Sequence, residues 1–428
     1  MTGALARARR AGSLAFAAQG FVLVTILASL PDVEERYGVG DDKITVAVLG
    51  VLVFAALGTG VSDQLSRRPG GSRVALGAGL VGIAVTVALV SLAPTYLTGV
   101  AAFALYGLAL GMVDAGTNMQ AVAVQRAYGR PLMASFYAWW SGGAIVATVV
   151  CSATVGRWPL DPVMAVFLLA LPVGLPAAWL VLRDGLRAHD VVEPTSEHAH
   201  APLLTNVAVP WRLISLLGAA LVAFYVADNA AQTWGSLYVR NTLGAADWLG
   251  PVALGAYLAT TLASRLLGDA LVVRAGRVRV VRVASLVAAV GLVVVVVAPG
   301  ALVAIVGFAV AGAGLGLVAP LAFAAAGELA PDHADAVVAR LNVFNYLGTL
   351  LGAVLVGAIG STSTFRYAFL VPVVVVLAIT ALSGRFDGPG YHHVRRAGAP
   401  DGVVAAPEDA PDPRRDPDEP EVWSHDAR

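Results

Sequence analysis

The sequence predicts an all-α integral membrane protein with 12 transmembrane helices in two parallel-repeated six-helix halves. Three observations predict this fold. Hydrophobic residues make up 58% of the 428 residues and charged residues only 13%, whereas a soluble domain carries about 25% charged residues. Twelve long apolar stretches follow one another with short polar breaks, and the second six resemble the first six at a fixed spacing. A soluble protein of this length would need more polar surface.

Each apolar stretch is close to, or longer than, the roughly 20 residues that a helix needs to cross the hydrocarbon layer of a bilayer. Several are long enough to cross it with a tilt. The predicted spans are residues 11–30, 44–62, 74–93, 97–121, 132–155, 160–182, 211–238, 248–271, 281–298, 301–327, 337–360 and 366–382.

Arginine and lysine divide unevenly between the loops. If the N-terminus is inside, the inside segments carry 19 of these residues and the outside segments carry 5. Positively charged loops stay on the cytoplasmic side, so both termini are predicted to be cytoplasmic, in a multi-pass protein of the cell membrane. The basic stretch from Arg7 to Arg10 is interpreted as the flank of an uncleaved first span, because eleven more spans follow it.

Two segments are predicted to lie outside the membrane. The chain divides into an N-terminal half (1–182), a cytoplasmic linker (183–210), a C-terminal half (211–384) and a cytoplasmic tail (385–428). The tail is rich in Pro, Asp, Glu and Arg. It cannot bury enough apolar area to fold, so it is expected to be disordered.

The composition also excludes several function classes. A formal net charge of zero excludes bulk electrostatics as a basis for binding nucleic acid. The single cysteine, Cys151, excludes an intrachain disulfide and a cysteine-based metal site. The single lysine, Lys43, follows Asp41 and Asp42 and therefore forms no ATP-binding P-loop. All seven histidines lie outside the spans. We therefore expect no enzyme, no cofactor and no metal, and a transport cycle driven by a gradient.

The two halves match at an offset of 205 residues. The landmarks include the Ala-Pro pair at 93 and 298, the phenylalanines at 103 and 308, the Gly-x-x-x-Gly pattern at 107 and 312, and the glycines at 143 and 348. Two halves with the same membrane orientation form a parallel repeat, a plan of transporters that bind substrate between the halves near the midplane.

The polar segment after the second span carries a family resemblance. The segment from Gly60 to Arg68 keeps the Asp and paired arginines of the loop motif G-x-x-x-D-R-x-G-R-R, and the stretch from Arg265 to Arg277 is its second copy. The chain resembles the major facilitator superfamily over about residues 10–385. The resemblance rests on these charged residues, on the internal repeat and on the number of spans. The resemblance implies a cytoplasmic gate that latches the halves during switching, formed by Asp63, Arg67, Arg68, Arg265, Asp269 and Arg274. The alternative interpretation is a positively charged inside loop with a charge pair.

Ionisable residues inside spans are costly and therefore candidates for function. Asp114 lies 12 residues before Arg126, or roughly 18 Å from the cytoplasmic end of its helix. Asn118 follows one turn later. The spacing from Asp114 to Asn118 resembles the E-T-x-x-N motif of proton-coupled fucose-type permeases, which implies that Asp114 takes up a proton beside the substrate. The alternative is an aspartate bonded only to neighbouring helices.

A second acidic residue, Asp228, lies in the seventh span with polar neighbours and is the second proton-coupling candidate. These neighbours form either one wall of a central cavity or hydrogen bonds between helices. The stretches around Gly20 and from Asp228 to Tyr238 resemble a bacterial branch of the superfamily related to sugar permeases. The predicted substrate-binding residues are Gln19, Asn118, Tyr137, Trp140, Asn229, Gln232, Trp234, Asn342, Asn345 and Tyr346.

The leading functional hypothesis is a secondary transporter that moves a small polar or sugar-like solute by alternating access in symport with a proton. The sequence leaves open whether sodium replaces the proton, which solute is moved and in which direction. The alternative is efflux of a drug or metabolite by proton antiport. The fifth span lacks the proline after glycine that the family's antiporter signature places there, which argues against antiport. The expected partners are the solute, the proton and the lipid bilayer, and the expected state is a monomer without nucleic acid.

Overall fold

The computed structural model describes residues 2–154, 168–186, 211–246, 248–362 and 365–387. Within these residues, eleven helices are long and apolar enough to cross a membrane. The predicted linker (183–210) lies outside the described residues from residue 187 on, and the predicted tail from residue 388 on. The sixth predicted span, 160–182, lies partly outside them, and its described part belongs to α8.

The first half is built from seven described helices. They are α1 (Thr2–Ala28), α2 (Leu30–Tyr37), α3 (Asp41–Ser66), α4 (Gly71–Leu92), α5 (Tyr96–Tyr128), α6 (Met133–Thr154) and α8 (Ala170–Asp184). The sequence predicts a loop where α2 stands. Its amphipathic residues Leu30 to Tyr37 instead form a short helix, with a proline in its first turn and the left-handed Gly38 after its last.

The second half follows the same plan with more interruptions. Its seventh span combines α9 (Trp211–Asn229), the π-helix η2 (Ala230–Trp234), α10 (Gly235–Leu237) and the π-helix η3 (Tyr238–Thr242). The further helices are α11 (Leu249–Ala275), α12 (Arg277–Val297), α13 (Ala301–Leu315), α14 (Val318–Leu329), the 3₁₀-helix η4 (Pro331–His333), α15 (Ala334–Thr362), α16 (Phe365–Ala368), α17 (Leu370–Leu382) and the 3₁₀-helix η5 (Ser383–Phe386).

The glycines of the repeat lie at equivalent helix crossings. A Cβ on Gly107 would stand 2.5 Å from the Val51 carbonyl oxygen, and one on Gly143 would stand 1.9 Å from that of Ala17. In the second half, Gly312 meets the Tyr257 carbonyl and Gly348 meets that of Val222. Only glycine permits these backbone approaches. The offset of 205 residues therefore reflects the same packing of helices in both halves.

A polar clasp also repeats at one end of each half. In the first half, Gln120 on α5 donates to the Ser72 hydroxyl (3.0 Å) and to the Leu186 carbonyl (3.0 Å). In the second half, Arg277 pairs with Glu328 at 2.7 Å and donates to the Phe386 carbonyl. Each clasp joins the start of one helix to the ends of two others. Phe386, close to the predicted boundary at 384, is fully buried.

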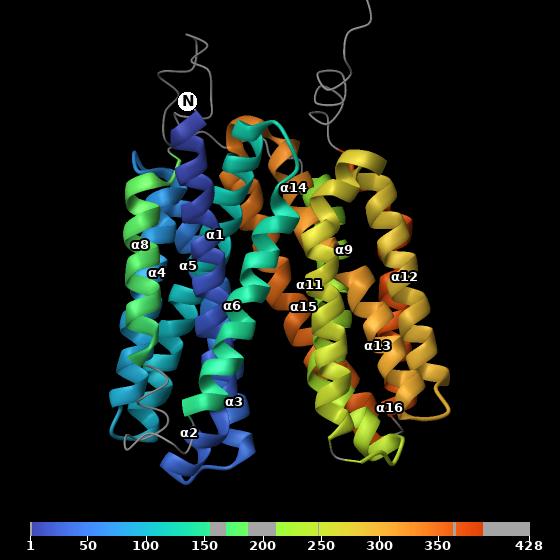
Figure 1. Ribbon diagram of the computed structural model, residues 1–428. Coiled ribbons are helices and arrows are strands. Elements are labelled where there is room, and N and C mark those ends of the chain that lie inside the picture. Colours follow the sequence, from blue (N-terminus) through green and yellow to red (C-terminus); the bar gives the residue numbers. More distant parts are fainter. Residues whose placement is uncertain (1, 155–167, 187–210, 247, 363–364, 388–428) are drawn as a thin grey trace, which may run out of the picture.

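The two halves lie closest at one end of the bundle and diverge toward the other (Figure 1). We call the close end the arginine-rich end. It holds the N-terminus and the turns that follow α3, α5 and α11. Helices α3 and α5 of the first half contact α15, and α6 contacts α11 and α14. Large apolar side chains such as Val46, Leu97 and Leu302 are exposed on the surface, as a lipid-facing bundle requires.

Candidate functional site

A buried carboxylate, Asp114, joins the two halves. It lies in α5, and its two oxygens accept hydrogen bonds from two further helices. The Gln19 amide, on α1 of the same half, donates to Oδ1. The Tyr346 hydroxyl, on α15 of the other half, donates to Oδ2. The sequence predicted all three residues as site residues, and the structure brings them together.

The hydrogen bonds around Asp114 continue into α6. The Thr117 hydroxyl donates to Gln19 Oε1 (3.3 Å), and the Asn118 amide donates to the backbone oxygen of Asp114 (2.9 Å). The Tyr137 hydroxyl, on α6, donates to Asn118 Oδ1 (3.0 Å). One network of polar contacts therefore runs from α15 through α5 and α1 to α6.

The guanidinium of Arg265 lies at the other end of this network. Its Cζ stands 5.4 Å from the ring centre of Tyr137 and 5.9 Å from that of Trp140. Its Nη1 donates to the Ser141 hydroxyl (2.7 Å) on α6, across the boundary between the halves, and its Nε donates to the Gly316 carbonyl (3.3 Å). Among the described residues it makes no salt bridge. The sequence predicts Arg265 as a residue of the cytoplasmic gate; its side chain is buried, one helical turn deeper in the bundle than Asp269.

Asp228 forms a second polar cluster within the second half. Its carboxylate accepts hydrogen bonds from the Tyr257 hydroxyl on α11 and from the Gln232 amide (2.7 Å) on η2. Both partners belong to the same half as Asp228, so this cluster does not bridge the two halves as Asp114 does. The predicted pair of Asp228 and Gln232 is brought together.

The other predicted substrate residues make their contacts outside the clusters around Asp114 and Asp228. Trp234 donates to the Ala353 carbonyl (3.3 Å) and stacks on Phe365. Asn229 donates to the backbone of its own helix. Asn342 is fully buried and donates to the Thr59 hydroxyl (3.2 Å) across the two halves. Asn345 is half-buried and accepts from Thr349 on its own helix. Of two adjacent tryptophans on α6, Trp140 lies near Arg265, while Trp139 is exposed.

The predicted gate residues other than Arg265 lie toward the arginine-rich end, near the ends of α3 and α11 or just after them. Asp269 accepts two backbone hydrogen bonds from the other half, from Ala134 N (3.0 Å) and Ser135 N (3.0 Å). These amides begin α6, so Asp269 caps that helix from across the boundary. Asp63 pairs with Arg67 (2.6 Å) on its own helix, and Arg68 and Arg274 are exposed.

The comparison with protein families decides the relationship. The sequence model of the Major Facilitator Superfamily matches residues 14–334 and 252–417. The chain belongs to the major facilitator superfamily.

The relatives within the superfamily agree with this membership. An MFS-type transporter of Yersinia pestis is 27% identical over 370 residues, which cover 86% of this chain and 93% of that protein. The superfamily is one of transporters and not a class of enzymes.

Two solved structures of superfamily members have the same fold. The fucose:proton symporter FucP of Escherichia coli, solved in an outward conformation, matches with a TM-score of 0.72 at 14% identity over 88% of this chain and 98% of its own. The proton:xylose symporter XylE, solved with 6-bromo-6-deoxy-D-glucose, matches with a TM-score of 0.72 at 12% identity over 89% of this chain and 95% of its own. At these identities the likeness concerns the fold.

The sequence did not predict the contacts of Tyr257 and Ser141 or the position of Tyr106 in this superfamily fold. Tyr257 bonds Asp228, Ser141 accepts from Arg265, and Tyr106 lines a cavity near Asp114. Tyr257 and Arg265 are eight residues apart, which places them on the same side of α11 two turns apart. That spacing is a signal that could have identified Tyr257.

Proposed function

We propose that this protein carries a small polar or sugar-like solute across the cytoplasmic membrane in symport with a proton, with Asp114 as the protonation site. As a member of the superfamily, it is a transporter that works by alternating access. The observation that carries the proposal is the position of Asp114, a buried carboxylate that is bonded at once by Gln19 of its own half and by Tyr346 of the other.

Protonation of Asp114 would couple proton movement to solute movement, because the free energy of enclosing the Asp114 side chain depends on whether it is charged. A charged carboxylate is expensive to enclose in a dry site, whereas a neutral carboxyl group is not. Closure around the loaded site is therefore easier once Asp114 holds a proton. A protonated carboxyl also has one fewer acceptor position for Gln19 and Tyr346, so the proton changes the contact between the halves. Asp228, bonded only within its own half, is proposed as a secondary proton site.

The solute is proposed to bind between the halves, beside the polar network. Gln19, Asn118, Tyr137 and Gln232 offer amide and hydroxyl groups of the kind that bind sugar hydroxyls, and Trp140 offers an aromatic face. The folds of FucP and XylE, whose structures are described as fucose:proton and proton:xylose symporters, support the sugar-like class.

The arginine-rich end is proposed to face the cytoplasm, because positively charged loops stay on that side. The halves meet there through the cap that Asp269 provides on α6. We therefore propose that this conformation is closed to the cytoplasm and that the cap is one element of the cytoplasmic gate, together with Asp63, Arg67, Arg68 and Arg274.

Proton movement in proteoliposomes tests the proposal. Purified protein is reconstituted with a pH-sensitive dye inside, and L-fucose or D-xylose is added outside. We expect acidification of the lumen with the wild-type protein and none with Asp114→Asn, which keeps the shape of the side chain. Asp184→Asn is the control, because Asp184 lies at the end of the bundle, where its partners among the described residues are Arg7 and Arg183.

Three results would contradict parts of the proposal. Acidification by Asp114→Asn at the wild-type rate would remove the coupling role of that residue. No acidification by the wild-type protein with either sugar would remove the assignment to sugar symport. Alkalinisation on addition of the solute would indicate the alternative function, efflux by proton antiport.

A further inference from the structure

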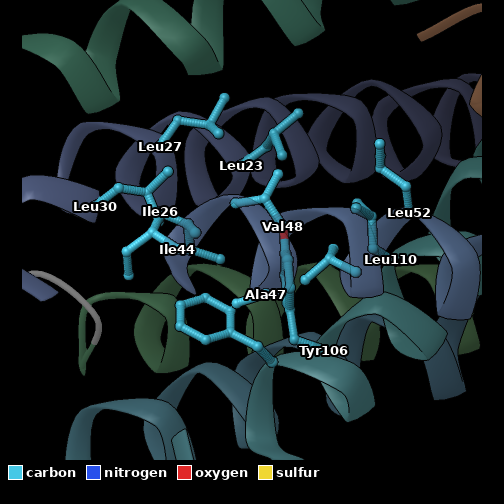
Figure 2. Close-up of a pocket in the computed structure, with 12 residues that line it drawn as sticks. Leu23, Ile26, Leu27, Leu30, Ile44, Ala47, Val48, Leu52, Tyr106 and Leu110 are labelled. Carbon is cyan, nitrogen blue, oxygen red and sulfur yellow. The ribbon is translucent and has the colours of Figure 1, made fainter. Parts of the chain in front are cut away.

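An apolar cavity lies between α1, α2, α3 and α5 of the first half (Figure 2). It is partly open and has a volume of about 80 Å³. Since one water position requires about 10–15 Å³, the cavity has room for a group of roughly five to eight non-hydrogen atoms. Its lining consists of Leu, Ile, Val, Ala and Phe side chains and a single tyrosine, Tyr106.

The cavity adjoins the polar cluster around Asp114. Along α5, the lining residues Leu110 and Tyr106 precede Asp114 by four and eight residues, about 6 Å and 12 Å along the helix. Along α1, Leu23 follows Gln19 by four residues. These spacings keep the residues on one side of each helix. The apolar cavity therefore begins one turn from the contact between Gln19 and Asp114, on the side away from the arginine-rich end.

The hydroxyl of Tyr106 has no partner in this cavity. The side chain is 1% exposed, and no described residue forms a hydrogen bond with its oxygen. Figure 2 shows the side chain reaching from α5 into the cavity. A buried hydroxyl without a partner destabilises a protein by about 1–3 kcal/mol. Phenylalanine would fill the same space without that loss, so a group that enters the cavity and bonds the hydroxyl would account for a tyrosine at this position.

We propose that the transported solute is amphipathic, with a polar head and a compact apolar group. The head binds at Gln19, Asp114 and Tyr346, and the apolar group, the size of an aromatic ring, fills the cavity and carries one oxygen that bonds the Tyr106 hydroxyl. A lipid chain would fill the cavity without bonding that hydroxyl, so it does not account for Tyr106. This inference rests on the proposed function and names the substrate class of the same site.

Matched pairs of glycosides test whether the solute carries the proposed apolar group. We would measure the affinities of methyl and phenyl glycosides of L-fucose and D-xylose for the full-length protein in lipid nanodiscs, through its tryptophan fluorescence. At least one phenyl glycoside should bind about tenfold more tightly than its methyl partner, because a buried aromatic ring removes apolar surface from water. In wild-type protein, the 4-hydroxyphenyl glycoside should bind more tightly than the phenyl one.

Three variants locate the effect. Ala47→Phe fills the cavity and should abolish the preference for the phenyl glycoside. Val46→Phe adds the same ring to the same helix at a position that is 66% exposed and outside the cavity, so it should keep the preference. Tyr106→Phe should keep the preference for phenyl over methyl and lose the additional gain from the 4-hydroxyl group.

Equal affinities for the two members of every pair, including no binding at all, would overturn the inference. Retention of the preference in both Ala47→Phe and Val46→Phe would also overturn it, because the effect would then arise from lipid and not from the cavity. The proposed function is judged separately, since acidification by free L-fucose or D-xylose involves no apolar group. A transporter that couples these sugars to protons through Asp114 but treats the paired glycosides alike would keep the proposed function and reject this inference.

Discussion

Three helices meet at the Asp114 carboxylate, and two of the three belong to one half. The third, α15, contributes the Tyr346 hydroxyl, so the bond between Tyr346 and Asp114 forms only when the two halves lie in this arrangement. In the proposed mechanism, the Asp114 side chain therefore responds to both the proton and the conformation. The strength of that bond should influence how tightly proton uptake and solute movement are linked.

Removal of the Tyr346 hydroxyl tests this link. Tyr346→Phe should reduce sugar-driven acidification in proteoliposomes by roughly tenfold, because a hydrogen bond to a charged group contributes about 1.5–3 kcal/mol. Tyr96→Phe is the matched control, since its hydroxyl bonds the Lys43 carbonyl at the far end of the bundle. A rate in Tyr346→Phe equal to that in Tyr96→Phe would mean that the contact has no part in coupling.

The residues of the candidate site differ in how well the sequence predicts them. Asp114 is conspicuous because charge is rare in the spans, and Asn118 lies one turn from it. Tyr106 and Tyr257 are not conspicuous, because a tyrosine within an apolar helix is as consistent with packing as with a polar contact. Trp234 illustrates the converse case, since its indole reaches Ala353 and Phe365 by a geometry that spacing along one helix does not reveal.

Among the elements, α6 shows how the helix crossings are specified. Gly143 and Gly142 are neighbours on this helix, yet only Gly143 touches α1. A Cβ on Gly143 would stand 1.9 Å from the Ala17 oxygen, while a Cβ on Gly142 would meet nothing within 4 Å. The position of a glycine, and not its presence, determines whether two helices can approach closely.

This difference predicts opposite effects of the same substitution. Gly143→Ala should separate α6 from α1 and lower the thermal unfolding temperature of the purified protein by several degrees, since single substitutions with a severe clash cost about 1–3 kcal/mol. Gly142→Ala should leave it unchanged or raise it, because alanine is the better helix former. Equal unfolding temperatures for the two variants would contradict the packing of α1 on α6.

The elements themselves are predicted more fully than the residues of the site. Apolar runs longer than 17 residues identify spans because the bilayer fixes their length. The helix breaks are less visible. The π-helices η2 and η3 shift the helical register around Gln232 and Arg240, and a single extra residue per turn leaves no mark on an almost uniformly apolar pattern. The short helix α2 is missed because acidic residues at an interface also suit a loop.

For the whole molecule, the cap that Asp269 places on α6 holds the halves together at the arginine-rich end. Asp269→Ala should favour conformations in which that end opens, because a lost helix cap costs about 1 kcal/mol and changes a population roughly fivefold. Spin labels at Arg130→Cys and Val273→Cys, in a Cys151→Ser background, should report longer distances in Asp269→Ala. Asp184→Ala is the control, and the same distances in both variants would contradict a latching role.

Membrane orientation is a further prediction for the whole molecule. The excess of arginine at one end predicts that a reporter fused after Pro210 lies in the cytoplasm. Alkaline phosphatase fused there should be inactive, and a fluorescent protein that folds only in the cytoplasm should be bright. Active phosphatase at this point would reverse the proposed orientation and with it the side to which the structure is closed.

The cap on α6 also makes two backbone groups into a natural reporter of the transport cycle. The amides of Ala134 and Ser135 have a partner in the other half only while the arginine-rich end is closed. When that end opens, these amides must turn to water. Their hydrogen–deuterium exchange should therefore accelerate whenever the protein visits its other conformation. The exchange rate of these two amides should then report, without any label, how often the protein switches.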